Sequence, residues 1–83
     1  MAINWDKARA VVMKINVLAT KHPDKIPRSD LLSLNNAIES RNKIQFLEHM
    51  TWILKAVAVH RLTERDELAR EILDEVQDLF EQE

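Results

Sequence analysis

The sequence contains no cysteine and no glycine, and its 83 residues include only two prolines. Without cysteine, neither a disulfide framework nor a metal site with thiolate ligands can support the fold. Without glycine, the chain lacks the residue that phosphate-binding loops need where the backbone takes positive φ or approaches a ligand closely. The common nucleotide-dependent functions built on such loops are therefore excluded.

Sheet proteins and membrane-spanning proteins also have little support in this sequence. Tight hairpins rely on Asn-Gly or Asp-Gly turns, and no long stretch alternates polar and apolar residues. No apolar run approaches the roughly 18 residues needed to cross a bilayer, and the N-terminus does not resemble a secretion signal. We therefore expect an all-α, soluble, cytoplasmic protein with no membrane association.

The composition is that of one small globular domain over residues 1–83. Hydrophobic residues make up 46% of the chain and charged residues 31%, a balance that argues against disorder. A domain of this size buries only about 60 to 68% of its unfolded surface, so its stability is modest. Small helical domains commonly gain stability by dimerising.

Apolar residues recur at intervals of three and four, which is the spacing of amphipathic helices. The spacing predicts a compact bundle of about four helices, at approximately residues 4–21, 29–39, 42–61 and 63–82. Asn4, Ser29, Asn42 and Thr63 stand at the expected helix starts, where their side chains can cap free backbone N–H groups. A helix that continues through residues 40–42 is an alternative to two separate helices.

The third predicted helix carries more apolar surface than a single core-facing side can use. One arc, which includes Phe46 and Val57, is expected to face the core, and a second strip contains Trp52, Ala56 and Val59. Either the other three helices enclose this strip, or it stays exposed on the monomer. The short second helix cannot cover a helix of about twenty residues, which spans roughly 30 Å. Exposed apolar patches that contain tryptophan are typical of association sites.

The residues expected to contact a partner are those of this strip and its polar edges: Gln45, Glu48, His49, Trp52, Ala56, Val59 and His60. The expected partner is another protein or a second copy of the chain, which would form a homodimer packed through the third helix.

The net charge of −2 conceals an asymmetry, because residues 1–63 hold ten Lys and Arg against five Asp and Glu, whereas residues 64–83 hold two against nine. The basic patch comprises Lys7, Lys14, Lys21, Lys25 and Arg28. The acidic patch comprises Glu64, Glu67, Glu71, Asp74 and Asp78. The favoured interpretation is that the first and last helices are antiparallel neighbours whose charges pair. In the alternatives, the basic patch binds nucleic acid or the acidic patch imitates phosphates.

Catalytic and metal-binding patterns are weak. Ser29, Ser33 and Ser40 lie at or near expected helix starts, where capping explains them without a nucleophilic role. His49 and His60 are eleven residues apart, whereas metal ligands on one helix lie three or four apart. We therefore expect no catalytic residue, no metal and no cofactor. The sequence predicts a non-enzymatic regulator, inhibitor or adaptor that occupies a partner's surface, with a nucleic-acid-associated accessory protein as the alternative.

Overall fold

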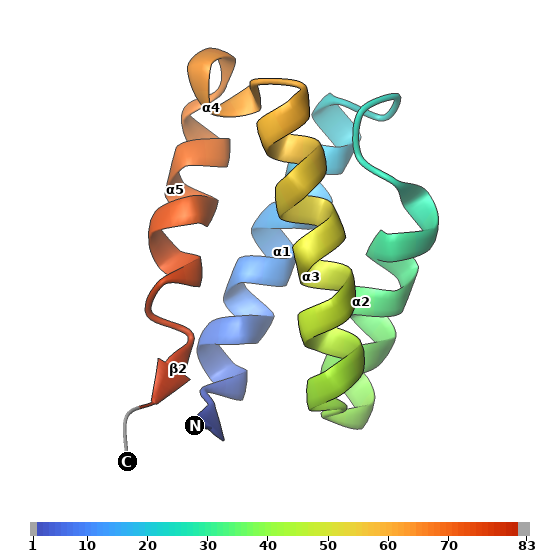
Figure 1. The fold of residues 1–83 in the computed structure, drawn as a ribbon, viewed down its shortest axis with the longest axis vertical. Coiled ribbons are helices and arrows are strands. Elements are labelled where there is room, and N and C mark those ends of the chain that lie inside the picture. Colours follow the sequence, from blue (N-terminus) through green and yellow to red (C-terminus); the bar gives the residue numbers. More distant parts are fainter. Residues whose placement is uncertain (1, 82–83) are drawn as a thin grey trace.

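The computed structural model describes residues 2–81 and is helical throughout most of its length (Figure 1). In chain order its elements are β1 (Ala2–Ile3), α1 (Trp5–Lys21), α2 (Arg28–Ser40), α3 (Lys43–Val59), α4 (Leu62–Arg65), α5 (Glu67–Val76) and β2 (Phe80–Glu81). The longer helices α1, α2, α3 and α5 run in alternating directions, and α4 links two of them at one end (Figure 1). The all-α prediction is confirmed. Within residues 2–81, none of the helices combines the length and the apolar character that a membrane span requires.

Helix α1 begins where the sequence predicts it. The Asn4 side chain accepts a hydrogen bond from the Lys7 N–H at 3.2 Å, so that it caps the first turn. At the other end the helix stops at Lys21, ahead of the two prolines, and the His22 N–H donates to the Leu18 carbonyl. One side of the helix is buried and consists of Ala8, Val11, Val12, Ile15 and Leu18.

The expected N-cap of α2 is wrong by two residues. Pro27 occupies the cap position with φ −61°, and α2 starts at Arg28, so Ser29 lies inside the first turn. A proline at the helix entry fixes an extended approach without needing a side-chain cap. At the far end, Arg41 adopts a left-handed conformation with φ 52° and ψ 43°. This residue separates α2 from α3 and rules out one continuous helix.

Helix α3 begins at Lys43 after the predicted Asn42 cap. The Asn42 side chain accepts a hydrogen bond from the Gln45 N–H at 3.0 Å. The Gln45 side chain does not complete a capping box, because its carbonyl oxygen accepts from the Asn36 amide of α2 at 3.3 Å. The helix start is therefore as expected, and the Gln45 side chain instead joins two helices.

The single helix predicted over residues 63–82 is wrong. The chain forms the short helix α4 after Arg61, which has φ 52°, and then an extended residue, Asp66, with φ −137° and ψ 119°. Thr63 lies inside α4, and Asp66 instead caps α5 by accepting a hydrogen bond from the Leu68 N–H at 2.9 Å. Helix α5 ends at Val76, and the described remainder of the predicted helix is a turn followed by β2. Residue 82 lies outside the described residues.

The two ends of the described chain are joined by a pair of two-residue strands. Strands β1 and β2 are antiparallel, with Ala2 opposite Glu81 and Ile3 opposite Phe80. The Asn4 N–H also donates to the Leu79 carbonyl at 2.8 Å. These contacts place the start of α1 beside the chain that follows α5 (Figure 1).

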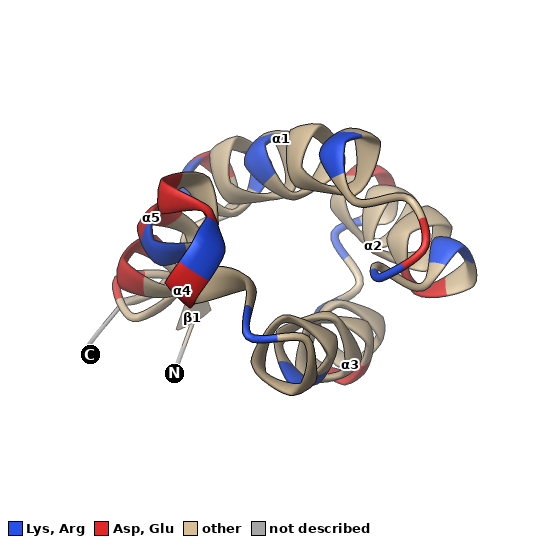
Figure 2. Ribbon diagram, turned by 90° about the horizontal axis from the view of Figure 1, so that it is seen from above, with Lys and Arg blue, Asp and Glu red and all other residues tan. Residues whose placement is uncertain are grey.

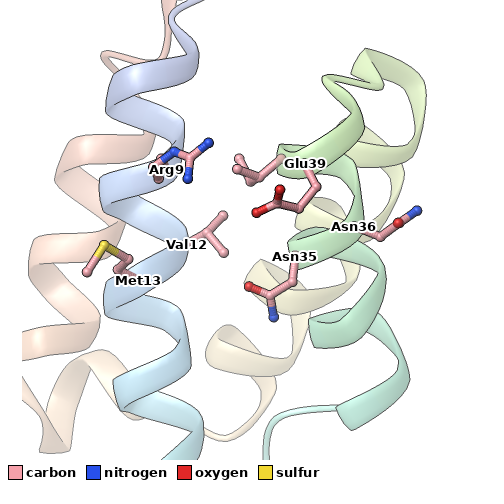
Figure 3. A pocket seen from close by; sticks show the side chains of 7 residues that line it. Arg9, Val12, Met13, Asn35, Asn36 and Glu39 are labelled. Carbon is pink, nitrogen blue, oxygen red and sulfur yellow. The ribbon is translucent and has the colours of Figure 1, made fainter.

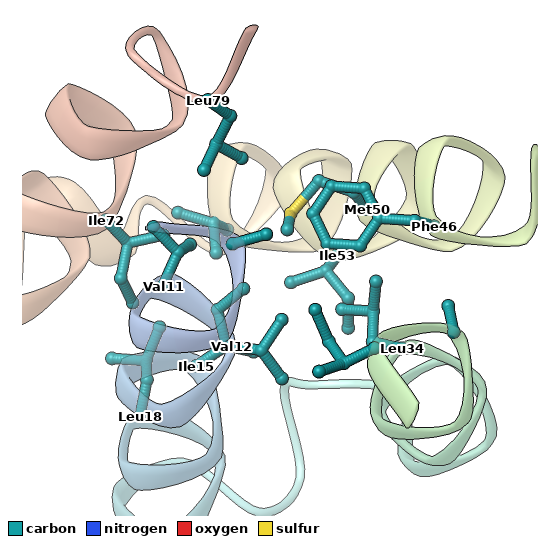
Figure 4. Packing of buried hydrophobic residues seen from close by; sticks show 14 of the residues in the cluster. Val11, Val12, Ile15, Leu18, Leu34, Phe46, Met50, Ile53, Ile72 and Leu79 are labelled. Carbon is teal, nitrogen blue, oxygen red and sulfur yellow. The ribbon is translucent and has the colours of Figure 1, made fainter. Parts of the chain in front are cut away.

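A core of buried hydrophobic side chains lies between the helices (Figure 4). Helix α1 packs against α5 on one side and α2 on the other, and α2 packs closely against α3. Among the largest fully buried side chains are Ile15, Leu34, Phe46 and Ile72, from four different helices. Phe46 meets the Trp5 ring edge to face, with ring centroids 5.7 Å apart. Helix α3 is thereby fixed against the rest of the molecule through one side.

Candidate interaction surface

Helix α3 has a buried apolar side and an exposed side that also carries large apolar residues. Phe46 and Val57 are almost completely buried. On the other side, Ile44 is 75% exposed, Trp52 54% and Val59 70%. In Figure 2, α3 lies at one edge of the molecule, across from α1. The strip around Trp52 and Val59 is therefore open on the monomer, as the sequence indicates.

We name the exposed side of this helix the outer stripe. Its members recur at intervals of three, four or one residue along one side of α3, and they are Ile44, Glu48, Thr51, Trp52, Lys55 and Val59. From first to last they extend over about 22 Å at 1.5 Å per residue. The stripe combines large apolar side chains with one charge of each sign.

Trp52 and Lys55 form the centre of the outer stripe. The Lys55 ammonium lies 5.1 Å from the centroid of the Trp52 ring, a distance at which the cation is attracted to the ring face. Beside them is an open hollow of about 230 Å³, which Glu48 and Thr51 also line. The lining of this hollow therefore combines an indole ring, a hydroxyl group and one charged group of each sign.

The remaining residues predicted to contact a partner are half-buried. His49 faces α2, where its Nδ1 atom lies 2.8 Å from the Asp30 carboxylate. With the Gln45 contact to Asn36, this interaction joins α3 to α2. Ala56 and His60 are also half-buried, at the margin of the stripe.

The prediction omits Ile44 and Thr51, which belong to the exposed side. Ile44 precedes Trp52 by eight residues, or about 2.2 helical turns, which places the two within about a quarter turn of one another around the helix. Extending the strip by two turns toward the N-terminus of α3 would have found it. The contacts of Gln45 and His49 with polar residues of α2 could not be found in this way, because they depend on how the two helices pack.

The basic patch is partly engaged within the molecule. Lys14 forms an ion pair with Glu75 of α5 at 2.7 Å, and the Lys21 ammonium lies 3.4 Å from the Asp66 carboxylate. The hydrogen bond to Glu75 raises the pKa of Lys14; partial desolvation opposes this rise, and the charges of Glu75 and Glu71 add to it. Lysines of α1 therefore face the neighbouring helix α5 and its cap, as the favoured interpretation expects. The carboxylates that they pair with, Glu75 and Asp66, are not members of the predicted acidic patch.

The other basic residues of the patch have different surroundings. Lys25 lies 3.6 Å from the carboxylate of its neighbour Asp24. Lys7 and Arg28 are exposed. The predicted patch is therefore not one continuous row of unpaired charge.

The acidic patch is exposed on α4, on α5 and in the turn that follows (Figure 2). Its members are Glu64, Glu67, Glu71, Asp74 and Asp78. Arg65 and Arg70 are exposed on the same two helices, so the negative surface is interrupted by positive charge.

A second hollow, of about 310 Å³, lies between α1 and α2 (Figure 3). Arg9 of α1 and Glu39 of α2 stand on its two walls, and Asn35 is part of its lining. The Asn35 and Asn16 amides exchange hydrogen bonds of 3.1 and 3.2 Å across the two helices. These polar contacts serve to hold α1 against α2. Exposed apolar residues are present on the two helices as well, at Met13, Val17 and Leu32.

The Asp66 carboxylate has three polar contacts, with the Leu68 N–H and with the Lys21 and His22 side chains. We predict that it makes a pH-dependent contribution to the stability of the fold. The Leu68 N–H, followed by the His22 and Lys21 side chains, lowers the pKa of Asp66 below its ordinary value of 3.8, against partial desolvation. The folded state thus favours the ionised form, so this stabilisation is present above that value and is lost as the pH falls through the lowered pKa. Asp66→Ala should reduce the free energy of unfolding by about 0.5 to 2 kcal/mol at neutral pH.

Urea denaturation followed by circular dichroism measures this effect at pH 7 and at progressively lower pH, as the wild-type carboxylate becomes protonated. The difference between the wild type and Asp66→Ala should shrink at the lower pH. Asp66→Asn, which keeps a capping oxygen but no charge, is the matched control and should lie between them. A difference that does not change with pH would show that the charge of Asp66 does not contribute.

Among residues 2–81, no group of three or more His, Cys, Asp or Glu side chains is arranged to hold a metal ion. Comparisons with protein-family models, curated proteins and solved structures find no significant similarity to this chain. Its function is therefore inferred from its own surface, on which the outer stripe of α3 combines an exposed tryptophan with exposed aliphatic residues.

Proposed function

We propose that this chain is a small non-enzymatic protein-interaction module, which acts as a regulator, inhibitor or adaptor by covering a partner's surface with the outer stripe of α3. The observation that carries the proposal is the 54% exposure of Trp52 between the still more exposed Ile44 and Val59. Tryptophan is enriched at the energetic centres of protein interfaces. Full burial of one large apolar side chain contributes roughly 1.5 to 3 kcal/mol. Covering the stripe would therefore add favourable free energy to the binding of a partner.

The rest of the fold suits this role, because it holds α3 rigidly by its other side. We regard the fold as a bundle of about four helices, in which α4 and α5 together form the fourth helix with an interruption between them. Phe46 and Ile53 anchor α3 in the core, and the His49 contact to Asp30 fixes its rotation relative to α2. A recognition surface on a rigid helix loses little conformational entropy when a partner binds.

The outer stripe is preferred over the charged surfaces as the binding site. Lys14 and Lys21 are already close to carboxylates, which weakens the basic patch as a phosphate-binding surface. The acidic patch is interrupted by Arg65 and Arg70, which are exposed on the same helices. A nucleic-acid-associated role stays an alternative, and a steep loss of nucleic-acid affinity with rising salt would favour it.

We predict that a photo-reactive phenylalanine derivative at position 52, introduced in the cell that makes this protein, will give one discrete cross-linked protein product. The same derivative at Leu32, an exposed residue of α2, is the matched control and should give none. Val59→Glu on the position-52 variant should abolish the product, because it places a charge in the outer stripe. Circular dichroism should show unchanged helicity in every variant.

Equal products from positions 52 and 32, or a position-52 product that persists with Val59→Glu, would show that the outer stripe is not the binding surface. Loss of helicity with Val59→Glu would contradict the exposed position of Val59. Trp52→Glu, tested without the cross-linker, should keep the helical signal and weaken the complex by about thirtyfold or more, as expected of an interface centre.

A further inference from the structure

We infer that the occupant of the outer stripe is the same stripe of a second copy of this chain, which packs antiparallel about a two-fold axis between Thr51 and Trp52. This inference depends on the proposed protein-binding role of the stripe and adds the identity and register of its partner. The order of charges and apolar residues along α3 carries it.

The two charges of the stripe lie at equal distances from this axis. Glu48 precedes it and Lys55 follows it by the same three and a half residues, or about 5 Å along the helix. In an antiparallel two-fold pair, a residue ahead of the axis faces the one equally far behind it on the partner. Glu48 therefore faces the partner's Lys55, and Lys55 faces the partner's Glu48, in two equivalent ion pairs.

The apolar residues match in the same register. Ile44 and Val59 each lie seven and a half residues from the axis, about 11 Å, so each meets the other at both ends of the contact. The two copies of Trp52 lie next to one another at the centre, where their exposed rings can pack together. Charge thus meets opposite charge, and apolar surface meets apolar surface.

Other arrangements of two α3 helices lose this match. A parallel pair in register places Glu48 against Glu48 and Lys55 against Lys55, which is repulsive. A shift of the axis by half a residue, onto Trp52, places Glu48 opposite the half-buried Ala56. The spacing therefore selects one orientation and one register.

The expected dimer is weak and depends on concentration. One helix face is small beside the roughly 800 Å² that each partner buries in a standard interface. The net charge of each chain is only −2, so overall repulsion between copies is slight. We expect the dimer to dissociate at micromolar concentrations. At higher concentrations the average mass of the wild type should approach twice that of the 9.7 kDa chain.

Charge reversal tests the register without disturbing the core. Glu48→Lys and Lys55→Glu each place like charges opposite one another at both contacts, so each variant alone should dimerise about tenfold or more weakly than the wild type. An equimolar mixture should recover dimers, because every lysine then faces a glutamate. The double variant should also recover them. Sedimentation equilibrium gives the dissociation constants, and circular dichroism checks that each variant folds.

The matched control is Glu39→Lys, which changes the charge equally at an exposed position of α2 and should leave dimerisation unchanged. Single variants that dimerise as well as the wild type, or a mixture that stays monomeric, would overturn this antiparallel register. A wild-type chain that is monomeric at millimolar concentration, while position 52 cross-links to a different protein, would overturn self-association and leave the proposed function intact. An absence of any cross-linked product from position 52 would instead refute the proposed function.

Discussion

Replacing Phe46 with alanine is expected to lower the free energy of unfolding by about 3 to 5 kcal/mol, the usual effect of removing a buried aromatic ring. The ring is fully buried in the core (Figure 4). It also packs edge to face against the partly buried Trp5. A chain of this size has roughly 5 to 15 kcal/mol of stability in total, so the variant should be partly unfolded at moderate temperature. Urea denaturation followed by circular dichroism measures the change.

The control is Trp52→Ala, which removes a larger ring from the other side of the same helix. Because Trp52 is 54% exposed, the free energy of unfolding of the monomer should change by only about 0.5 kcal/mol. The comparison is made below the concentration at which the chain dimerises. Equal losses from Phe46→Ala and Trp52→Ala would mean that both sides of α3 are packed inside the monomer, and the outer stripe would have no surplus surface for a partner.

The two sides of α3 therefore differ in what their apolar residues do. The core uses Phe46, Ile53 and Val57 and so fixes α3 in place. Trp52 and Val59 lie outside this core and leave apolar surface in water. The proposed function assigns this exposed apolar surface to association with a partner.

Local periodicity was enough to predict the first three helices and the open strip on the third. The apolar spacing of α1 and the capping ability of Asn4 and Asn42 are both properties of adjacent residues, and they determine where α1 and α3 begin. The exposure of Trp52 followed from counting apolar surface on α3 against the length of α2. These inferences needed no knowledge of distant contacts.

The end of the chain could not be predicted in the same way. Leu79 and Phe80 follow Val76 by three and four residues, which fits a continuing helix as well as a turn. What decides between them is the pairing of Phe80 with Ile3 and of the Leu79 carbonyl with the Asn4 N–H, across nearly the whole sequence. Local spacing contains no information about such contacts.

The helix breaks near Arg41 and Arg61 were predicted, whereas the break at Asp66 was not. Both arginines adopt φ 52° without being glycine, so the usual marker of a left-handed helix end is missing from the sequence. A break near the first was anticipated from the polar run around it, and the second was placed correctly only to within a few residues. Asp66 then provides the cap that starts α5.

Leu79→Ala is expected to reduce the free energy of unfolding by about 2 to 5 kcal/mol, although Leu79 lies only two residues before the end of the described chain. Its side chain is fully buried, and its carbonyl accepts the Asn4 N–H at 2.8 Å. The substitution therefore leaves a cavity in the core and weakens the pairing of β1 with β2. Thermal or urea unfolding measures it, with Asp78→Ala as the neighbouring exposed control, for which a change of about 0.5 kcal/mol is expected.

Amide hydrogen exchange at Asn4 tests the same contact from the other end of the chain. In the wild type this N–H should be protected by the Leu79 carbonyl, and Leu79→Ala should raise its exchange rate more than Asp78→Ala does. A continuous last helix would engage the Leu79 carbonyl within its own turns and leave the Asn4 N–H open to water. Rapid wild-type exchange at Asn4 would thus contradict the contact with the Leu79 carbonyl, whereas slow exchange would show that β1 and the chain after α5 open together as one cooperative unit.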